Sequence, residues 1–389
     1  MIASPIVLAL ALQSAAAEPQ PPASGAVQDE ILVIARRNAA ALDRCLTAGC
    51  PPIDDIKASI AVAEHSFYNG DYRGARSVLA RSIARNKGYA KEMPGAVAAL
   101  YEASSNVNIH FGDRRAYRSD IANRVEIMRD SAPGDTMQQI AASALLGDMW
   151  LATGASEQAA RAYKATAAQA VASGVPRLGA YFDLRRANVH LASGHFAEAD
   201  QVLRTVERGA FASDPGVREA IAGFRIRLAS VRKDGAGLER AMADLAALQP
   251  RATPVLVSYK PIASSAQQGV EAASRDWDTP VGNVPIGSNR YAWVDIGFEI
   301  GSDGRTRDAQ VLRGRMNAER TTAITRHIAS RRYSPFTPET GATGTYRVER
   351  YSLRSPRGVP PNSNVVQRVG AQQLEMMDIT RSYLAPPDA

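Results

Sequence analysis

The sequence predicts an α+β protein in two parts, an all-α array of helical repeats followed by a small α+β domain. Its 389 residues exceed what one hydrophobic core usually supports, which favours two structural units. Alanine is abundant and aromatic residues make up only 6%, a composition that suits closely packed helices because alanine has the highest helix propensity. Residues 291–300 alternate between apolar and other side chains, which is the period of a β-strand.

Glycines that follow amphipathic segments recur at nearly equal intervals between positions 53 and 248 of the chain. Self-similarity at a fixed period indicates stacked helix pairs, because no pair buries its apolar face without its neighbours. The sequence therefore predicts five helical units, with turns at Gly70, Gly112, Gly154, Gly194 and Gly235.

The first and fourth units place small, large and aromatic residues at matching offsets from the glycine. These residues are Ala63, Phe67, Tyr72, Ala75 and Leu79 in the first unit, and Ala187, Leu191, Phe196, Ala199 and Leu203 in the fourth. The pattern resembles the tetratricopeptide repeat (TPR), whose two helices meet at a glycine and cross through a small residue. Ser156 stands where the third unit needs an aromatic residue, and the match weakens in the second and fifth, so whether those two are true repeats stays open.

The spacing of about 41 residues exceeds the roughly 34 residues usual for that family, which implies longer helices or longer loops. The resemblance implies a concave surface that binds a peptide or protein partner. A rigid spacer is the alternative interpretation.

A second group of elements is predicted towards the C-terminus. The strand at 291–300 is expected to have one face in a core and one nearer water. After it, the sequence predicts an Asp-Gly turn at 303–304, a strand at 309–313, a helix at 317–330 and a strand at 345–353. This order describes a small α+β domain.

Residues of this domain form an ordered motif. Val294, Ile296, Phe298 and Ile300 fill the first strand, Asp303 and Gly304 the turn, Val311 the second strand, and Arg332, Tyr333 and Pro335 follow the helix. The set resembles the C-terminal domain of the TonB family of energy transducers. The resemblance implies that an exposed sheet edge binds an extended partner segment by strand addition. The residues expected to bind the partner are Trp293, Arg332, Tyr333, Arg347 and Tyr351.

Residues 29–37, DEILVIARR, resemble the TonB box, the docking segment of TonB-dependent outer-membrane receptors. From composition alone the same segment is a short edge strand or the first turn of a helix. The sequence shows neither the membrane anchor nor the long proline- and lysine-rich spacer of the TonB transducers, so energy transduction is kept as an alternative function.

The segment Met1–Ala17 is typical of an export signal. A short apolar run at 6–12 precedes Ala15, Ala16 and Ala17, although no positive charge precedes the run. Cleavage near Ala17 predicts a periplasmic protein. In that oxidising compartment Cys45 and Cys50 are expected to form a local disulfide, which in the chain-entropy model adds about 2 kcal/mol. Two buried free thiols are the alternative.

Composition divides the rest of the chain. The predicted boundaries are a signal peptide at 1–17, a flexible segment at 18–37, TPR-like repeats at 38–249, a connector at 250–288, the TonB-like domain at 289–354 and a flexible tail at 355–389. A short strand at 255–259 lies in the connector. A helix at 366–380 is expected in the tail.

Residues that carry chemistry do not converge in the sequence. The five histidines are isolated, and a metal pair formed by His190 and His195 lacks a carboxylate at ligand spacing. Asp54 and Asp55 follow two prolines and are explained as first-turn carboxylates that interact with the helix dipole. We therefore expect no catalytic residue, no cofactor and no metal. An enzyme assembled from dispersed residues is the alternative.

The sequence predicts a non-enzymatic, periplasmic protein-binding adaptor, peripheral to the membrane rather than spanning it. The formal charge of +7 is dispersed, so nucleic acid is not an expected partner. The expected partner is a protein or peptide, such as an outer-membrane receptor segment or a TonB-like domain. An energy-transducer-like protein and a purely structural envelope-assembly protein are the alternatives. Partner identity and oligomeric state stay open.

Overall fold

The computed structural model describes most of the repeats and most of the sheet. The described residues are 37–132, 134–248, 254, 256–260, 262, 292–338, 342–354, 357–358, 367–368, 373–380 and 383. The predicted signal peptide, residues 18–36 and most of the predicted connector lie outside this part of the chain. The TonB-box-like segment therefore also lies outside it, except for its last residue, Arg37.

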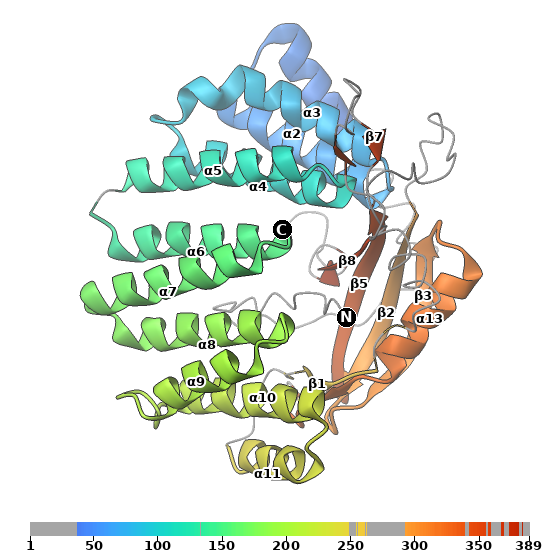
Figure 1. Cartoon of the computed structure of the whole chain (residues 1–389). Coiled ribbons are helices and arrows are strands. Elements are labelled where there is room, and N and C mark those ends of the chain that lie inside the picture. Colours follow the sequence, from blue (N-terminus) through green and yellow to red (C-terminus); the bar gives the residue numbers. More distant parts are fainter. Residues whose placement is uncertain are drawn as a thin grey trace.

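Helices of the described repeat region stack as five antiparallel pairs (Figure 1). The pairs are α2 (Pro52–Tyr68) with α3 (Tyr72–Asn86), α4 (Pro94–Phe111) with α5 (Arg114–Ser131), α6 (Thr136–Ala152) with α7 (Ser156–Ala172), α8 (Pro176–Ala192) with α9 (Phe196–Glu207), and α10 (Pro215–Arg232) with α11 (Gly235–Ala246). A further helical stretch at 37–48 precedes them, and η1 (Lys87–Tyr89) follows α3. The predicted helical-repeat array is confirmed.

Left-handed residues separate the two helices of each pair. Gly70, Gly112, Gly154 and Gly194 have φ between 75° and 86°, a conformation that glycine adopts without a steric cost. In the first two pairs an aspartate follows the glycine, and its side chain caps the next helix by accepting a hydrogen bond from a backbone N–H. Glycine ends one helix and aspartate begins the next.

The fifth turn differs from the prediction. Lys233, with φ of 57°, adopts the left-handed conformation, and Gly235 is the first residue of α11. Asp234 caps α11 by accepting a hydrogen bond from the backbone N–H of Gly237. Gly235 therefore matches the spacing of the other four glycines but does not form the turn. The fifth unit is nevertheless a helix pair, as predicted.

The long period comes from long helices. The first helix of each pair has 17 or 18 residues. Small residues stand where the helices cross, and Ala75, Ala159 and Ala199 are fully buried. In the third unit Gly147 lets the ring of Tyr163 approach, because a Cβ at residue 147 would lie 2.6 Å from that ring. Close crossings of this kind account for the high alanine content.

The second part of the protein is a four-stranded antiparallel sheet in the order β3-β2-β5-β8. Its strands are β2 (Trp293–Gly301), β3 (Thr306–Gly314), β5 (Gly344–Arg354) and β8 (Gln373–Asp378). Helix α13 (Ala318–Ala329) covers one face, and Ile324 and Ile328 on it pack against Val294, Ile296, Phe298 and Ile300 on β2. The predicted order of strand, turn, strand, helix and strand is therefore found.

Further small elements lie in the sheet region. A short strand, β1 (Leu256–Ser258), lies within the strand predicted at 255–259 and pairs with β4 (Arg332–Tyr333). Both residues of β6 (Arg357–Gly358) pair with those of β7 (Gln367–Arg368).

The predicted helix at 366–380 is wrong. Residues 373–378 form β8, which pairs with β5 from Glu349 to Arg354, and Ile379 beyond it is buried. The segment therefore belongs to the sheet rather than to a flexible tail. Its pairing satisfies the outer edge of β5, a tertiary requirement that the periodicity of so short a segment does not reveal.

The expectation that β2 has one face nearer water is also wrong. Trp293 and Asp295 are as fully buried as the apolar residues of the strand. The first helix pair covers this second face, since Trp293 joins the same apolar cluster as Phe67, Tyr72 and Leu79.

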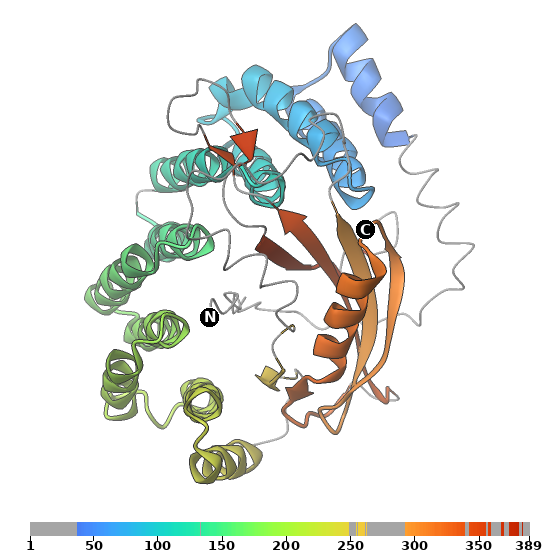
Figure 2. The same cartoon turned by 45° about the vertical axis from the view of Figure 1, so that its right-hand side comes forward.

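The sheet region contacts both ends of the array. It packs on α2 and α3 of the first pair and on α4 of the second, and at the fifth pair β1 packs on α10. Figure 2 shows the helices as an arc whose opening is spanned by the sheet. Among the described residues, no helix is both long and apolar enough to cross a membrane.

Candidate functional site

One fully buried arginine joins the sheet to the first helix pair. The guanidinium of Arg350 donates to both carboxylate oxygens of Asp295 at 2.6 and 2.8 Å. It also donates to the carbonyl oxygens of Phe67 and Tyr68, each at 2.6 Å. These carbonyls lie in the last turn of α2, where a cation interacts favourably with the helix dipole. Arg350 therefore binds the end of α2 to the sheet.

Trp293 fills the space beside this arginine. The guanidinium carbon of Arg350 lies 4.0 Å from the centroid of the Trp293 ring. The indole also packs closely on Gly70, where a Cβ would lie 1.9 Å from the indole nitrogen. The Tyr72 hydroxyl and Ser352 Oγ, 2.7 Å apart, add a hydrogen bond across the same boundary. We call Arg350, Asp295, Trp293, Gly70 and Tyr72 the seam.

Two of the residues predicted to bind a partner are buried, Trp293 in the seam and Tyr351 on the other face of the sheet. Trp293 is 4% exposed and Tyr351 is 2% exposed, so in this structure both contact the chain's own core. Trp293 is covered by the first helix pair. Tyr351 lies under α13, on the opposite face of the sheet.

The other three predicted residues lie nearer the surface. Arg347 forms an ion pair of 2.8 Å with Asp378 of β8, and both side chains are partly exposed. Arg332 is exposed on β4, and the adjacent Tyr333 is partly buried. The structure therefore does not bring the five predicted residues together into one surface.

A second buried polar cluster forms around Arg331, the residue that precedes β4. Arg331 donates to Glu349 at 2.7 Å and to the Tyr351 hydroxyl at 2.8 Å, and that hydroxyl donates to the other carboxylate oxygen of Glu349 at 2.6 Å. Burial raises the pKa of Tyr351 well above its ordinary value, so the phenol stays protonated. The cluster fixes the end of α13 against β5 with its charges paired.

His327 connects this cluster to β1. Its Nδ1 lies 2.7 Å from the carbonyl oxygen of Lys260, which follows β1, and its Nε2 lies 3.4 Å from a nitrogen of Arg331. Burial lowers the pKa of His327, and Arg331 acts in the same direction. The neutral imidazole therefore joins the sheet region to the segment that packs on α10.

The two edges of the sheet differ. Within the described ranges the edge strands are β3, which pairs with β2 alone, and the shorter β8, which pairs with β5 alone. The β2–β3 pairing has two register shifts, and Asp308 within β3 adopts a left-handed conformation with φ of 51°. Such bulges are a feature of edge strands, because they limit unspecific pairing.

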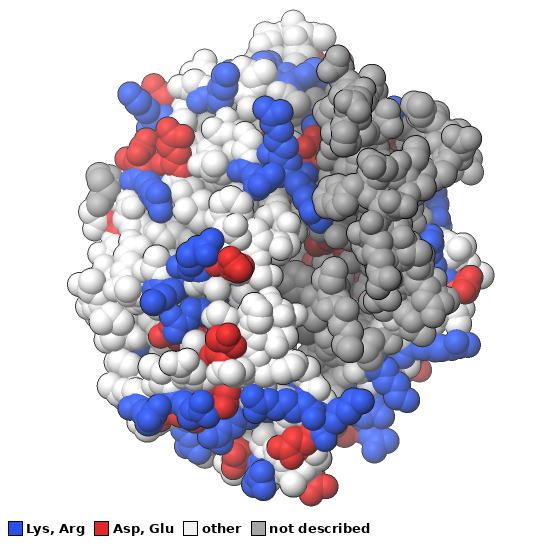
Figure 3. All heavy atoms as spheres, viewed as in Figure 1, with Lys and Arg blue, Asp and Glu red and all other residues white. Residues whose placement is uncertain are grey.

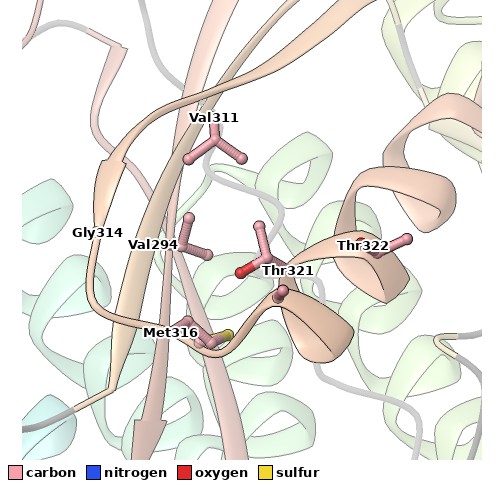
Figure 4. Close-up of a pocket in the computed structure, with 7 residues that line it drawn as sticks. Val294, Val311, Gly314, Met316, Thr321 and Thr322 are labelled. Carbon is pink, nitrogen blue, oxygen red and sulfur yellow. The ribbon is translucent and has the colours of Figure 1, made fainter.

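A pocket of about 300 Å³ opens between β3 and the start of α13 (Figure 4). Its lining is Val294, Val311, Gly314, Met316, Ala318, Thr321 and Thr322. Val294, Val311 and Thr321 face one another across the pocket. Val311 is 49% exposed, an unusual position for a large apolar side chain on a strand. We call the pocket and the outer side of β3 the edge groove.

Several arginines on the helices form ion pairs. Figure 3 shows basic and acidic side chains close together over much of the array, with a row of basic residues along its lower helices. Ion pairs join arginines to acidic residues between neighbouring helices, namely Arg76 with Asp113, Arg185 with Asp148, Arg177 with Asp214 and Arg225 with Glu207. Pairing of this kind serves the packing of one helix on the next.

Asp55 has a larger role than the predicted interaction with the helix dipole. It accepts hydrogen bonds from Arg85 at 2.6 and 2.9 Å, from Asn86 at 2.6 Å and from Ser59 at 3.0 Å. Burial alone would raise the pKa of Asp55, but these hydrogen bonds outweigh it and the pKa is lowered. The carboxylate ties α2 to α3. Because Arg85 and Asn86 lie at the far end of the next helix, no local motif identifies the contact.

The remaining predicted sites are found as follows. Cys45 and Cys50 form a disulfide, with Cα atoms 4.8 Å apart. The rings of His190 and His195 lie 6.2 Å apart. In the described part of the chain, no group of three or more histidine, cysteine or acidic side chains could hold a metal ion.

No protein-family model and no curated protein matches the sequence. Among solved structures, two chains described as a Podosopora anserina kinesin light chain with nearly identical TPR-like repeats match, one of them a single-substitution variant. They are 14% and 15% identical and cover 51% of this chain, and the match spans 96% and 95% of their own length. Each TM-score is 0.39, so the assignment of the repeats rests on the helix pairs described above.

Proposed function

We propose that the protein is a non-enzymatic adaptor that binds proteins of the cell envelope. The observation that supports this most is the double contact of the sheet region, which packs on the first helix pair through the seam and on α10 through β1. An array held at both ends keeps a fixed curvature. A preformed surface loses less entropy on binding than a mobile one.

We further propose that the adaptor acts in the periplasm. The disulfide between Cys45 and Cys50 supports this, since disulfides persist in oxidising compartments. The leader-like segment Met1–Ala17 supports it independently. In intact cells, a thiol-reactive polyethylene glycol maleimide should shift the protein on a gel only after reduction. Prompt labelling without a reductant would count against export.

Strand addition remains the mode of binding that we propose for the sheet, following the resemblance to the TonB C-terminal domain. Within the described ranges the sheet has two edge strands, β3 and the shorter β8, and we take β3 as the docking edge because the pocket adjoins it. If both edge strands of the sheet were paired with other strands of this chain, a purely structural role in envelope assembly would be favoured instead.

Photocrosslinking in cells tests the adaptor role. A photoreactive phenylalanine placed at Met137 or Val171, which are 54% and 56% exposed on the array, or at Val311 on β3, reports on separate surfaces. We expect at least one position to give a discrete adduct with one partner, and a reporter at the buried Leu79 to give none. A chain that gives no discrete adduct from any surface position is not an adaptor.

A further inference from the structure

The edge groove combines an unpaired strand side, an apolar pocket and a basic surrounding within the described residues. These three features limit the kind of molecule that could bind there. We propose that the edge groove binds an extended segment of a partner protein, in which acidic residues flank an apolar side chain that enters the pocket. The inference rests on the proposed adaptor function and names the class of partner.

The backbone of β3 provides the first part of the site. Among the described residues its outer side faces no other strand, so its N–H and C=O groups on that side are available to an incoming strand. The register shifts lie on either side of Gln310 and Val311, which pair regularly with Gly297 and Ile296. The shifts divide the pairing into three stretches of two residues each, and the central stretch is the one that contributes Val311 to the pocket. Backbone pairing over so few residues needs a side-chain anchor in addition.

The pocket provides that anchor. It adjoins the regular stretch, because Val311 lines it and Val294 at its base is buried in the sheet core. Its volume of about 300 Å³ is at the lower end of the range of roughly 300–1,000 Å³ for small-molecule sites. Four of its seven lining residues are valine, methionine or alanine, and no charged residue lines it. The pocket therefore suits one large apolar side chain of an extended segment.

Charge determines what flanks the anchor. Residues 289–389 carry fifteen arginines, ten acidic residues and no lysine, so this region contributes five of the seven net positive charges of the chain. At one end of β3, Arg305 and Arg307 share the carboxylate of Asp303, and the exposed Asp308 is the other acidic residue of this stretch. At the other end Arg315 is exposed beside the pocket. A segment with acidic residues on both sides of its apolar anchor complements this edge.

Selection from a random peptide library displayed on phage, with the immobilised full-length protein, tests the proposal. We expect enrichment of peptides that combine acidic residues with a large apolar residue. A synthetic peptide of an enriched sequence, labelled for fluorescence polarisation, should bind at least tenfold more weakly to Val311→Arg. Val231→Arg is the matched control, because Val231 is 52% exposed on α10, and it should bind as the wild type does.

Two further variants keep the test decisive. Thr321→Trp fills the pocket from α13, where Thr321 faces Val294 and Val311, and it should weaken binding even if Val311→Arg folds poorly. Arg315→Glu should weaken binding and reduce its sensitivity to salt. The inference is overturned if no peptide is enriched, if enriched peptides lack acidic residues, or if binding survives both pocket variants. Adducts from Met137 or Val171 would leave the adaptor role standing in that case.

Discussion

At the scale of single residues, Arg350 joins two elements that are far apart in the sequence, since it lies on β5 and binds the end of α2. Its register opposite Asp295 on β2 places the two charges side by side, and Arg313 on β3 reaches the same carboxylate at 2.9 Å. A buried ion pair adds little net stability compared with apolar residues, but breaking it leaves an uncompensated charge. The pair therefore fixes where the sheet docks more than it stabilises the fold.

Replacing Arg350 with methionine tests this role. Arg350→Met leaves Asp295 buried with only Arg313 as an ionic partner, and we expect a loss of about 3–5 kcal/mol in the free energy of unfolding. Chemical denaturation measures it. In the control Arg347→Met, the broken pair with Asp378 is partly exposed and should cost under about 1 kcal/mol. Equal losses in the two variants would show that the seam has no special role.

Two glycines with similar backbone conformations allow the energetic cost of a steric clash to be distinguished from the cost of a left-handed backbone. Gly70 and Gly154 have φ of 75° and 80°, but only at Gly70 would a Cβ meet Trp293. We expect Gly154→Ala to cost about 1–2 kcal/mol, the penalty for a left-handed conformation. Gly70→Ala should cost clearly more, with a change in tryptophan fluorescence. If thermal unfolding shows the same loss of stability for both variants, the contact between Gly70 and Trp293 does not contribute to stability.

His327 makes stability depend on pH. Its pKa is lowered in the folded protein, so the unfolded chain binds the proton more tightly and stability decreases as pH falls below about 6.5, the ordinary histidine pKa. His65 and His190 have lowered pKa values through burial and act in the same direction. Replacing His327 with glutamine should make the free energy of unfolding between pH 7 and 5 less steep. An unchanged slope would mean that His327 does not contribute.

At the scale of elements, the sequence predicted the features that depend on neighbouring residues, such as helix caps and tight turns. Asn317 caps α13 by accepting a hydrogen bond from the backbone N–H of Arg320, close to the predicted start of the helix. Gly304, with φ of 74°, turns β2 into β3 at the predicted position. The missed features depend on contacts between distant segments. Neither β8 nor the pairing of Asp295 with Arg350 leaves a periodic pattern in the sequence.

Deleting residues 373–389 tests the role of β8. The deletion uncovers the outer side of β5 and removes Met377, which packs against the cluster that contains Trp293. We expect lower stability and concentration-dependent self-association, because an unpaired strand edge pairs with other chains. Light scattering after size-exclusion chromatography measures the association. A deletion variant that keeps the mass and stability of the full chain would contradict this assignment.

At the scale of the whole molecule, the sheet region acts as a brace for the helical array. Stacked repeats contact only their neighbours, so small changes at each interface add up to a large change in curvature. Contacts at the first pair and at α10 remove that freedom. The sequence predicted both parts of the protein, but not that they meet, because the seam consists of residues with no shared local motif.

The most direct test of the brace is the distance between the two ends of the array. Spin labels on cysteines placed at the exposed Arg73 of α3 and Arg240 of α11 allow this distance to be measured by pulsed electron resonance, since Cys45 and Cys50 are already paired. We predict one narrow distribution in the otherwise unchanged chain and a broader one in Arg350→Met that remains helical by circular dichroism. Equally narrow distributions in both would contradict the brace.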